Sequence, residues 1–252
     1  MAKHLWGVSK PVAQAITGLI FPSNGDANND VRFVLTGASL LNPFPATYIW
    51  KVKNIQQNGY YTNFFWGPDG TFTGAGYYGF HPYPDSPPSG SAHKYEVSAN
   101  GGDYVTGSPA ITIGSFVTQA AVITNSGGNV TMTYYYDLSS LSNKITPPAY
   151  SGYAAGFPPA GTPALIFGGA PWNPGNECLS GTLRGIQVYA SALSEANIAA
   201  AAALEYDASV LALGLNPWYL NMNPTPTDIT DKSGNGHNPS WSTANRPTLY
   251  TA

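Results

Sequence analysis

The chain has 252 residues, a formal net charge of −3 and only 9% charged residues, against 13% aromatic ones. Roughly a quarter of the residues of an ordinary soluble domain are charged, so this chain is unusually neutral. Its 10 lysines and arginines gather in no segment, which argues against the basic face that a nucleic-acid-binding protein needs. The 43% of hydrophobic residues can form a core, and the length suits one large β domain.

The cysteine content and the first residues bear on where the chain folds. The single cysteine, Cys178, excludes an intrachain disulfide framework. Lys10 and Pro11 interrupt the apolar content of the first residues, so we expect no signal peptide. No apolar run reaches about 18 residues, and we expect no membrane insertion. These features predict folding in a reducing cytoplasm.

Short β-prone runs separated by Gly, Pro, Asn and Asp occupy most of the chain. They cover residues 31–36, 46–53, 60–66, 93–98, 115–124, 129–137, 164–169 and 183–190. In residues 46–53, Tyr48 and Trp50 fall on the same face of the expected strand. The turn at 125–128 predicts a long antiparallel hairpin over residues 115–137. The whole pattern is typical of an all-β, antiparallel two-sheet jelly-roll sandwich.

One helix is expected, near residues 195–206, where Ser194 can cap the start and Glu195 favours the helix dipole. Two segments rich in Gly, Pro and aromatic residues, 74–92 and 147–163, are expected to be long loops.

This pattern predicts three parts. Residues 1–20 are expected to form an N-terminal arm, and residues 21–213 the sandwich. The Pro- and Asn-rich segment 214–252 is expected to pack on the sandwich or on a neighbouring subunit.

Residues 179–198 (LSGTLRGIQVYASALSEANI) resemble the last strand and following helix of laminin-G-like domains, in the concanavalin A-like lectin/glucanase superfamily. The segment DITDKSGNGHNPSW at 228–241 resembles the D-x-S-G-N-G segment of such proteins, although there it starts the module and here it follows the helix. The resemblance implies a jelly roll with a concave face, of the kind found in bacteriophage structural proteins. It implies no particular function, because one fold serves many.

Catalytic patterns are missing from the sequence. A glycosidase needs two carboxyl groups about 5–10 Å apart, and related glucanases carry an E-x-D-x-x-E arrangement. No acidic neighbour stands at that spacing from Glu96, Glu177, Glu195 or Glu205. The four histidines show no metal-ligand spacing. The sequence therefore predicts that the protein is not an enzyme and needs no cofactor, with calcium as the one open case.

Calcium remains open because relatives of the resembled family often hold one ion. Asp228, Asp231 and Asn235 offer oxygen atoms close together in the sequence, and oxygen is what calcium prefers. The same residue types also make turns and caps, and this second role is favoured.

Binding through aromatic side chains is the most plausible chemistry. Flat rings pack on the C–H faces of sugars, while polar groups bond the hydroxyls. Candidate glycan-binding residues are Trp66, Tyr77, Tyr78, His81, Tyr83 and Trp172. The alternative is that strand aromatics fill the core or brace the loops.

Together these features predict a non-catalytic structural protein of a virion, such as a capsid decoration, fibre or tail component. It would be made in the host cytoplasm and would contact copies of itself, other virion proteins or cell-surface glycans. The alternative is a cellular carbohydrate-binding lectin module, for which no export signal is visible. A glycoside hydrolase ranks third.

Overall fold

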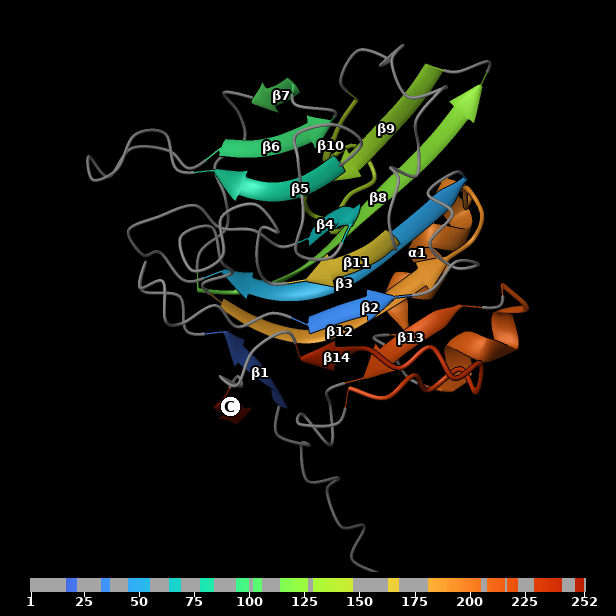
Figure 1. Cartoon of the computed structure of the whole chain (residues 1–252). Helices are drawn as coiled ribbons and strands as arrows, with labels where there is room; N and C mark the ends of the chain where they lie inside the picture. The colour runs from blue at the N-terminus through green and yellow to red at the C-terminus, as the bar shows by residue number, and fades with distance from the viewer. Residues whose placement is uncertain are drawn as a thin grey trace, which may run out of the picture.

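The structure, a computed structural model, describes residues 17–21, 33–36, 45–54, 64–68, 78–83, 94–99, 102–105, 114–126, 129–146, 163–167, 181–204, 208–215, 217–221, 229–241 and 248–251. Within these residues the strands form two antiparallel sheets, one of eight strands and one of seven. The sheets stack as the two layers of a jelly-roll sandwich (Figure 1). The all-β, two-sheet fold class is therefore confirmed.

The first sheet contains the long hairpin and the strand with the resembled motif. Its order is β10 (Lys144–Ile145), β9 (Asn129–Tyr135), β8 (Phe116–Ser126), β3 (Ala46–Asn54), β12 (Gly181–Tyr189), β1 (Thr17–Phe21) and β15 (Thr248–Thr251), and β13 (Trp218–Asn221) also pairs with β12. Strands β8 and β9 pair from Ala120–Tyr135 to Ser126–Asn129, so the hairpin expected over residues 115–137 is confirmed.

The second sheet includes a strand that the sequence did not predict. Its order is β14 (Ser240–Trp241), β2 (Phe33–Thr36), β11 (Pro163–Phe167), β4 (Phe64–Pro68), β5 (Tyr78–Tyr83), β6 (Lys94–Ala99) and β7 (Gly102–Val105). Strand β5 lies inside the segment 74–92, so the expectation of one continuous loop there was wrong. Pairing with β6 along all of β5 outweighs the turn tendency of its Gly79 and Pro82. Pro82, which lacks an N–H, lies beyond the residues of β5 that pair with β4.

Both ends of the chain contribute strands to the sheets. Strand β1 pairs with residues 181–183 of β12, and β13 pairs with residues 185–188 along the same edge. The register of β12 against β3 shifts between Leu183 and Gly185, as in a β-bulge. Strands β14 and β15 add to β2 and β1. The sandwich therefore extends beyond the expected limits of 21–213.

The inner face of the first sheet, which carries Tyr48 and Trp50, forms the core. Both side chains are almost completely buried, and so are Thr47 and Ile49 on the opposite face of β3. The indole Nε1 of Trp50 donates to Oε1 of Gln119 at 2.8 Å, and Nε2 of Gln119 donates to the carbonyl of Tyr136 at 3.1 Å. The Trp50 and Tyr134 rings stack with centroids 6.0 Å apart. The side-chain amide of Gln119 thus pairs the buried N–H of Trp50 and the carbonyl of Tyr136.

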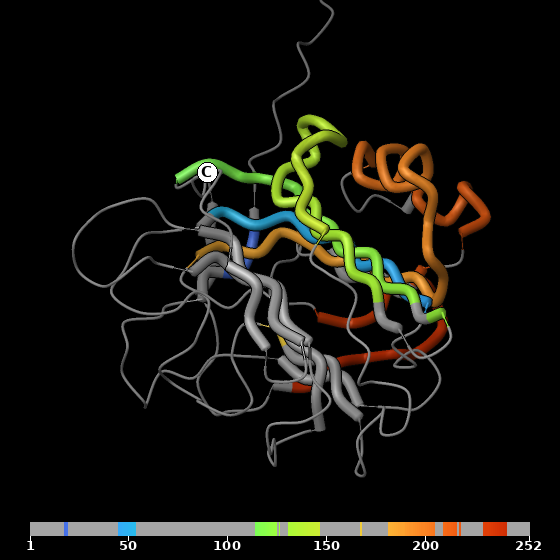
Figure 2. Tube along the Cα trace, turned by 90° about the horizontal axis from the view of Figure 1, so that it is seen from above, coloured from blue at the N-terminus to red at the C-terminus, as the bar shows by residue number. Residues whose placement is uncertain are grey.

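Helix α1 (Glu195–Ala203) covers part of the opposite, outer face of this sheet, together with the 3₁₀ helix η2 (Ala208–Leu213). The expected cap is confirmed, because Oγ of Ser194 accepts from the N–H of Asn197 at 3.3 Å. The helix ends at Ala203 rather than near residue 206. Figure 2 shows α1 and the turn after β9 on the same side of β3, β8 and β12. In the described part of the chain, no helix is long and apolar enough to cross a membrane.

Candidate functional site

The aromatic residues expected to bind glycans fall into two groups. Trp66 lies within β4, directly opposite Tyr78 of β5, and His81 and Tyr83 follow on β5. Tyr77 and Trp172 lie outside the described residues.

Strand pairing places these positions on different faces of the second sheet. Successive residues of a strand alternate between faces, so the positions of Trp66 and Tyr78 share one face and those of His81 and Tyr83 share the other. Trp66 also pairs with Leu165, two residues before Phe167, whose side chain is fully buried. The positions of Trp66, Tyr78, His81 and Tyr83 therefore do not form one continuous aromatic surface on the sheet.

The expected calcium residues lie in a self-contained turn. Oδ1 of Asp231 accepts from the N–H of Ser233 at 2.9 Å, and Oδ2 accepts from the Ser233 hydroxyl at 2.7 Å and the His237 N–H at 3.2 Å. Both carboxylate oxygens thus already serve the turn, as expected of an Asx turn. Asn235 bonds Ser233 as well, and Asp228 lies outside the described residues. Within the described residues, no three His, Cys, Asp or Glu side chains are grouped to hold a metal ion.

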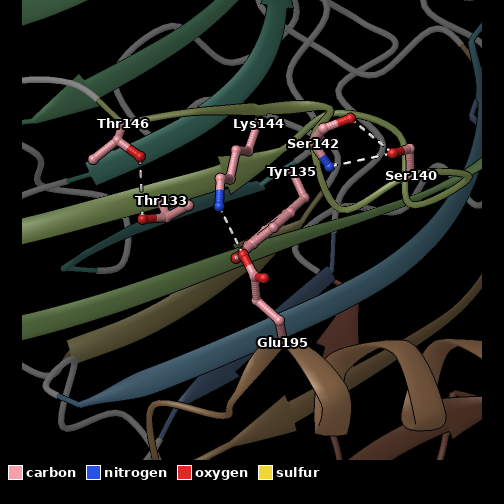
Figure 3. Close-up of polar contacts among 7 residues, drawn as sticks. All are labelled: Thr133, Tyr135, Ser140, Ser142, Lys144, Thr146 and Glu195. Carbon is pink, nitrogen blue, oxygen red and sulfur yellow. Dashed lines mark hydrogen bonds and ion pairs between the residues drawn. The ribbon is translucent and has the colours of Figure 1, made fainter.

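Glu195 anchors the start of helix α1 to the first sheet. Its Oε1 accepts from Nζ of Lys144 at 2.7 Å and from the Tyr135 hydroxyl at 3.0 Å (Figure 3). The bond from Lys144 lowers the pKa of Glu195, and the bond from Tyr135 adds to this. Burial raises the pKa of Tyr135 to about 12, helped by Glu195. These partners come from strands about 50 to 60 positions away, and no local pattern could have indicated them.

A cavity of about 330 Å³ opens on the outer face, where the last residues of α1 and not Glu195 line it. Lys51 of β3 and Phe116 and Thr118 of β8 line it from the sheet. The turn at 137–139 forms one wall, and alanines of α1 between 199 and 203 form another. The turn is fixed to β8 because the N–H of Leu138 donates to the carbonyl of Thr118 at 2.8 Å. The cavity is therefore built from four separate parts of the chain.

The polar groups of this outer cavity are arranged around Asp137. Its Oδ1 accepts from the N–H of Ser139 at 2.8 Å. Among the described residues, neither Oδ2 of Asp137 nor the hydroxyl of Thr118 takes part in a hydrogen bond. Nζ of Lys53 lies 5.4 Å from the centre of the Phe116 ring, at cation–π distance. The cavity thus combines hydrogen-bonding groups with one aromatic ring.

None of the residues lining this cavity was predicted as a binding residue. In the sequence, Asp137 is typical of a turn after a strand, and the alanines indicate only a helix. The one usable signal was the alanine run itself, since small side chains on a surface helix leave space above a sheet.

No known protein family matches the sequence, and no curated protein does so. Solved structures with a similar fold include the heptameric SAP-like pentraxin from Limulus polyphemus, which is 16% identical. This likeness covers 69% of the present chain and 82% of the pentraxin, with a TM-score of 0.40.

Two further similar structures come from a bacterium and a bacteriophage. The CBM40 of the Ruminococcus gnavus IT-sialidase is 12% identical, with 73% of this chain and 95% of that one covered and a TM-score of 0.45. Tailspike protein 2 of bacteriophage CBA120 is 14% identical, with 80% and 32% covered and a TM-score of 0.43. At these values no ligand, activity or assembly is transferred to the present chain.

Proposed function

We propose that this chain is a non-catalytic, glycan-binding structural protein of a virion, such as a capsid decoration, fibre or tail component. The observation that carries the glycan-binding part is the outer cavity, which brings Asp137, Thr118 and the Phe116 ring together on a rigid sheet. Sugar sites need this combination of hydrogen-bonding groups and a flat apolar surface.

A binding role without catalysis is supported by the carboxyl groups. Hydrolysis of a glycosidic bond needs two of them about 5–10 Å apart. Asp137 is the one acidic side chain among the described residues that line the cavity. Glu195, at the other end of α1, does not line the cavity and is held by Lys144 and Tyr135.

A virion role is supported by the neutral surface. With 9% charged residues and a net charge of −3, little repulsion keeps copies of the chain apart. Leu211 and Leu213 of η2 are also 39% and 37% exposed. Such a surface favours assembly with further copies or with other virion proteins.

Light scattering at several concentrations, with a glycan array and an assay for released sugar, tests this proposal. We expect a discrete oligomer that binds glycans and releases no sugar. A clean monomer with micromolar glycan affinity would support the cellular lectin instead. Release of reducing sugar would overturn the non-catalytic role.

A further inference from the structure

The outer cavity has the size of a site for one small molecule. Its volume of about 330 Å³ lies at the lower end of the range of roughly 300–1,000 Å³ that small-molecule sites occupy. A hollow of this size holds one sugar ring.

A carboxylate among the groups that line the cavity favours a ligand with hydroxyl groups. Lys51 and Asp137 are the charged residues among the described ones that line it, and Nζ of Lys53 lies 5.4 Å from the centre of the Phe116 ring that also lines it. A ligand carboxylate would lie close to the Asp137 carboxylate and be repelled by it. A hydroxyl, in contrast, can donate to Oδ2 of Asp137, which no described residue bonds.

From this size and from the Asp137 carboxylate we infer that the outer cavity binds the ring of a single neutral sugar, with Asp137 and Thr118 bonding its hydroxyls and Phe116 contacting its C–H face. This inference rests on the proposed glycan-binding function and names the ligand class of that site.

Helix α1 sets the size limit of the site. Ala199 lines the cavity, whereas its neighbour Ala200 does not, and both are exposed. A leucine at position 199 would fill part of the hollow, while a leucine at position 200 would point away from it. Both changes suit an exposed helical position, since leucine and alanine are both good helix formers. The two variants therefore differ in their access to the cavity and hardly in folding.

The test titrates the ¹⁵N-labelled full chain with methyl glycosides of glucose, galactose, mannose and N-acetylglucosamine, and with sialyllactose and glucuronate as acidic probes. We expect a neutral glycoside to bind with a Kd on the order of 1 mM, as the affinity per atom of small ligands implies. Ala199→Leu and Asp137→Asn should each raise this Kd at least about tenfold. Ala200→Leu should leave it within about twofold.

Thermal unfolding verifies that each variant folds. If Ala199→Leu does not fold, Thr118→Val replaces it, with Thr131→Val on the outer face of β9 as its control. Binding of acidic probes alone, or glycoside binding that Ala199→Leu and Asp137→Asn leave unchanged, would overturn this inference and leave glycan binding elsewhere on the chain intact. If no probe and no array glycan binds, both the inference and the glycan-binding part of the proposed function fail.

Discussion

Nζ of Lys144 lies 2.7 Å from Oε1 of Glu195, so the two-residue edge strand β10 is joined to the first residue of helix α1. The same oxygen accepts the Tyr135 hydroxyl from β9. This contact holds the start of α1 over the outer face of the first sheet. The contact is at the N-terminal end of α1, whereas the alanines that line the outer cavity are near its C-terminal end.

The Glu195 anchor predicts an acid-dependent loss of stability. The pKa of Glu195 is lowered below 4.5 in the folded protein. The contribution of its carboxylate to the free energy of unfolding is therefore present above pH 4.5 and is lost as the pH falls through the folded pKa. We expect Glu195→Gln to lower the Tm slightly at pH 7, because both side chains are largely exposed and such pairs contribute little. The difference from wild type should shrink as the pH falls through the lowered pKa of Glu195. A constant difference across this range, measured by circular dichroism, would argue against the ion pair.

The raised pKa of Tyr135 predicts a loss of stability in alkali instead of in acid. Its pKa is raised from 10.0 to about 12, so its contribution to stability is complete below pH 10 and is lost as the pH rises through 12. Tyr135→Phe should therefore lose less stability than wild type between pH 10 and 12, although it is less stable at pH 7. Urea unfolding at both ends of this interval measures the change. Equal losses in the two proteins would mean that Tyr135 ionises as freely in the folded state as in the unfolded one.

Thr47 ties the turn before α1 to strand β3. Its buried hydroxyl donates to the carbonyl of Ser191 at 2.7 Å and accepts from the N–H of Leu193 at 2.9 Å. Thr47→Val leaves both backbone groups without this partner and should cost about 1–3 kcal/mol in urea unfolding. Thr47→Ser is the matched control, since it keeps the hydroxyl and should cost about 1 kcal/mol. Equal losses in the two variants would show that packing, and not the hydrogen bonds, matters at this position.

Gly18 allows β1 to lie close against β12. A Cβ atom at this position would stand 2.8 Å from the carbonyl oxygen of Leu183 and 2.8 Å from Cγ2 of Thr182. Because a backbone atom cannot move aside cheaply, Gly18→Ala should lower the free energy of unfolding by about 1–3 kcal/mol. Unchanged stability would mean that Gly18 belongs to the separate N-terminal arm that the sequence predicted over residues 1–20.

Asp231 tests whether the turn needs a metal ion. Asp231→Ala removes the acceptor of three hydrogen bonds and should cost about 1–3 kcal/mol. If the carboxylate serves the turn alone, thermal unfolding should show the same loss in calcium and in EDTA. A wild-type Tm that rises with calcium while the variant's does not would instead establish a calcium site.

Features that depend on neighbouring residues follow from the sequence alone. The alternation in residues 46–53 placed Tyr48 and Trp50 on one face of β3, and the turn at 125–128 predicted the β8–β9 hairpin. Ser194 specified the start of α1, because a cap forms within one turn of helix.

Features that depend on distant pairing arise only when the chain folds. Residues 78–83 became a strand because β4 and β6 pair with them, and residues 17–21 became one because β12 and β15 do. The outer cavity likewise joins β3, β8, the turn at 137–139 and α1. Neighbouring residues set local propensity, but the free energy of strand pairing and of burial belongs to segments that meet only after folding.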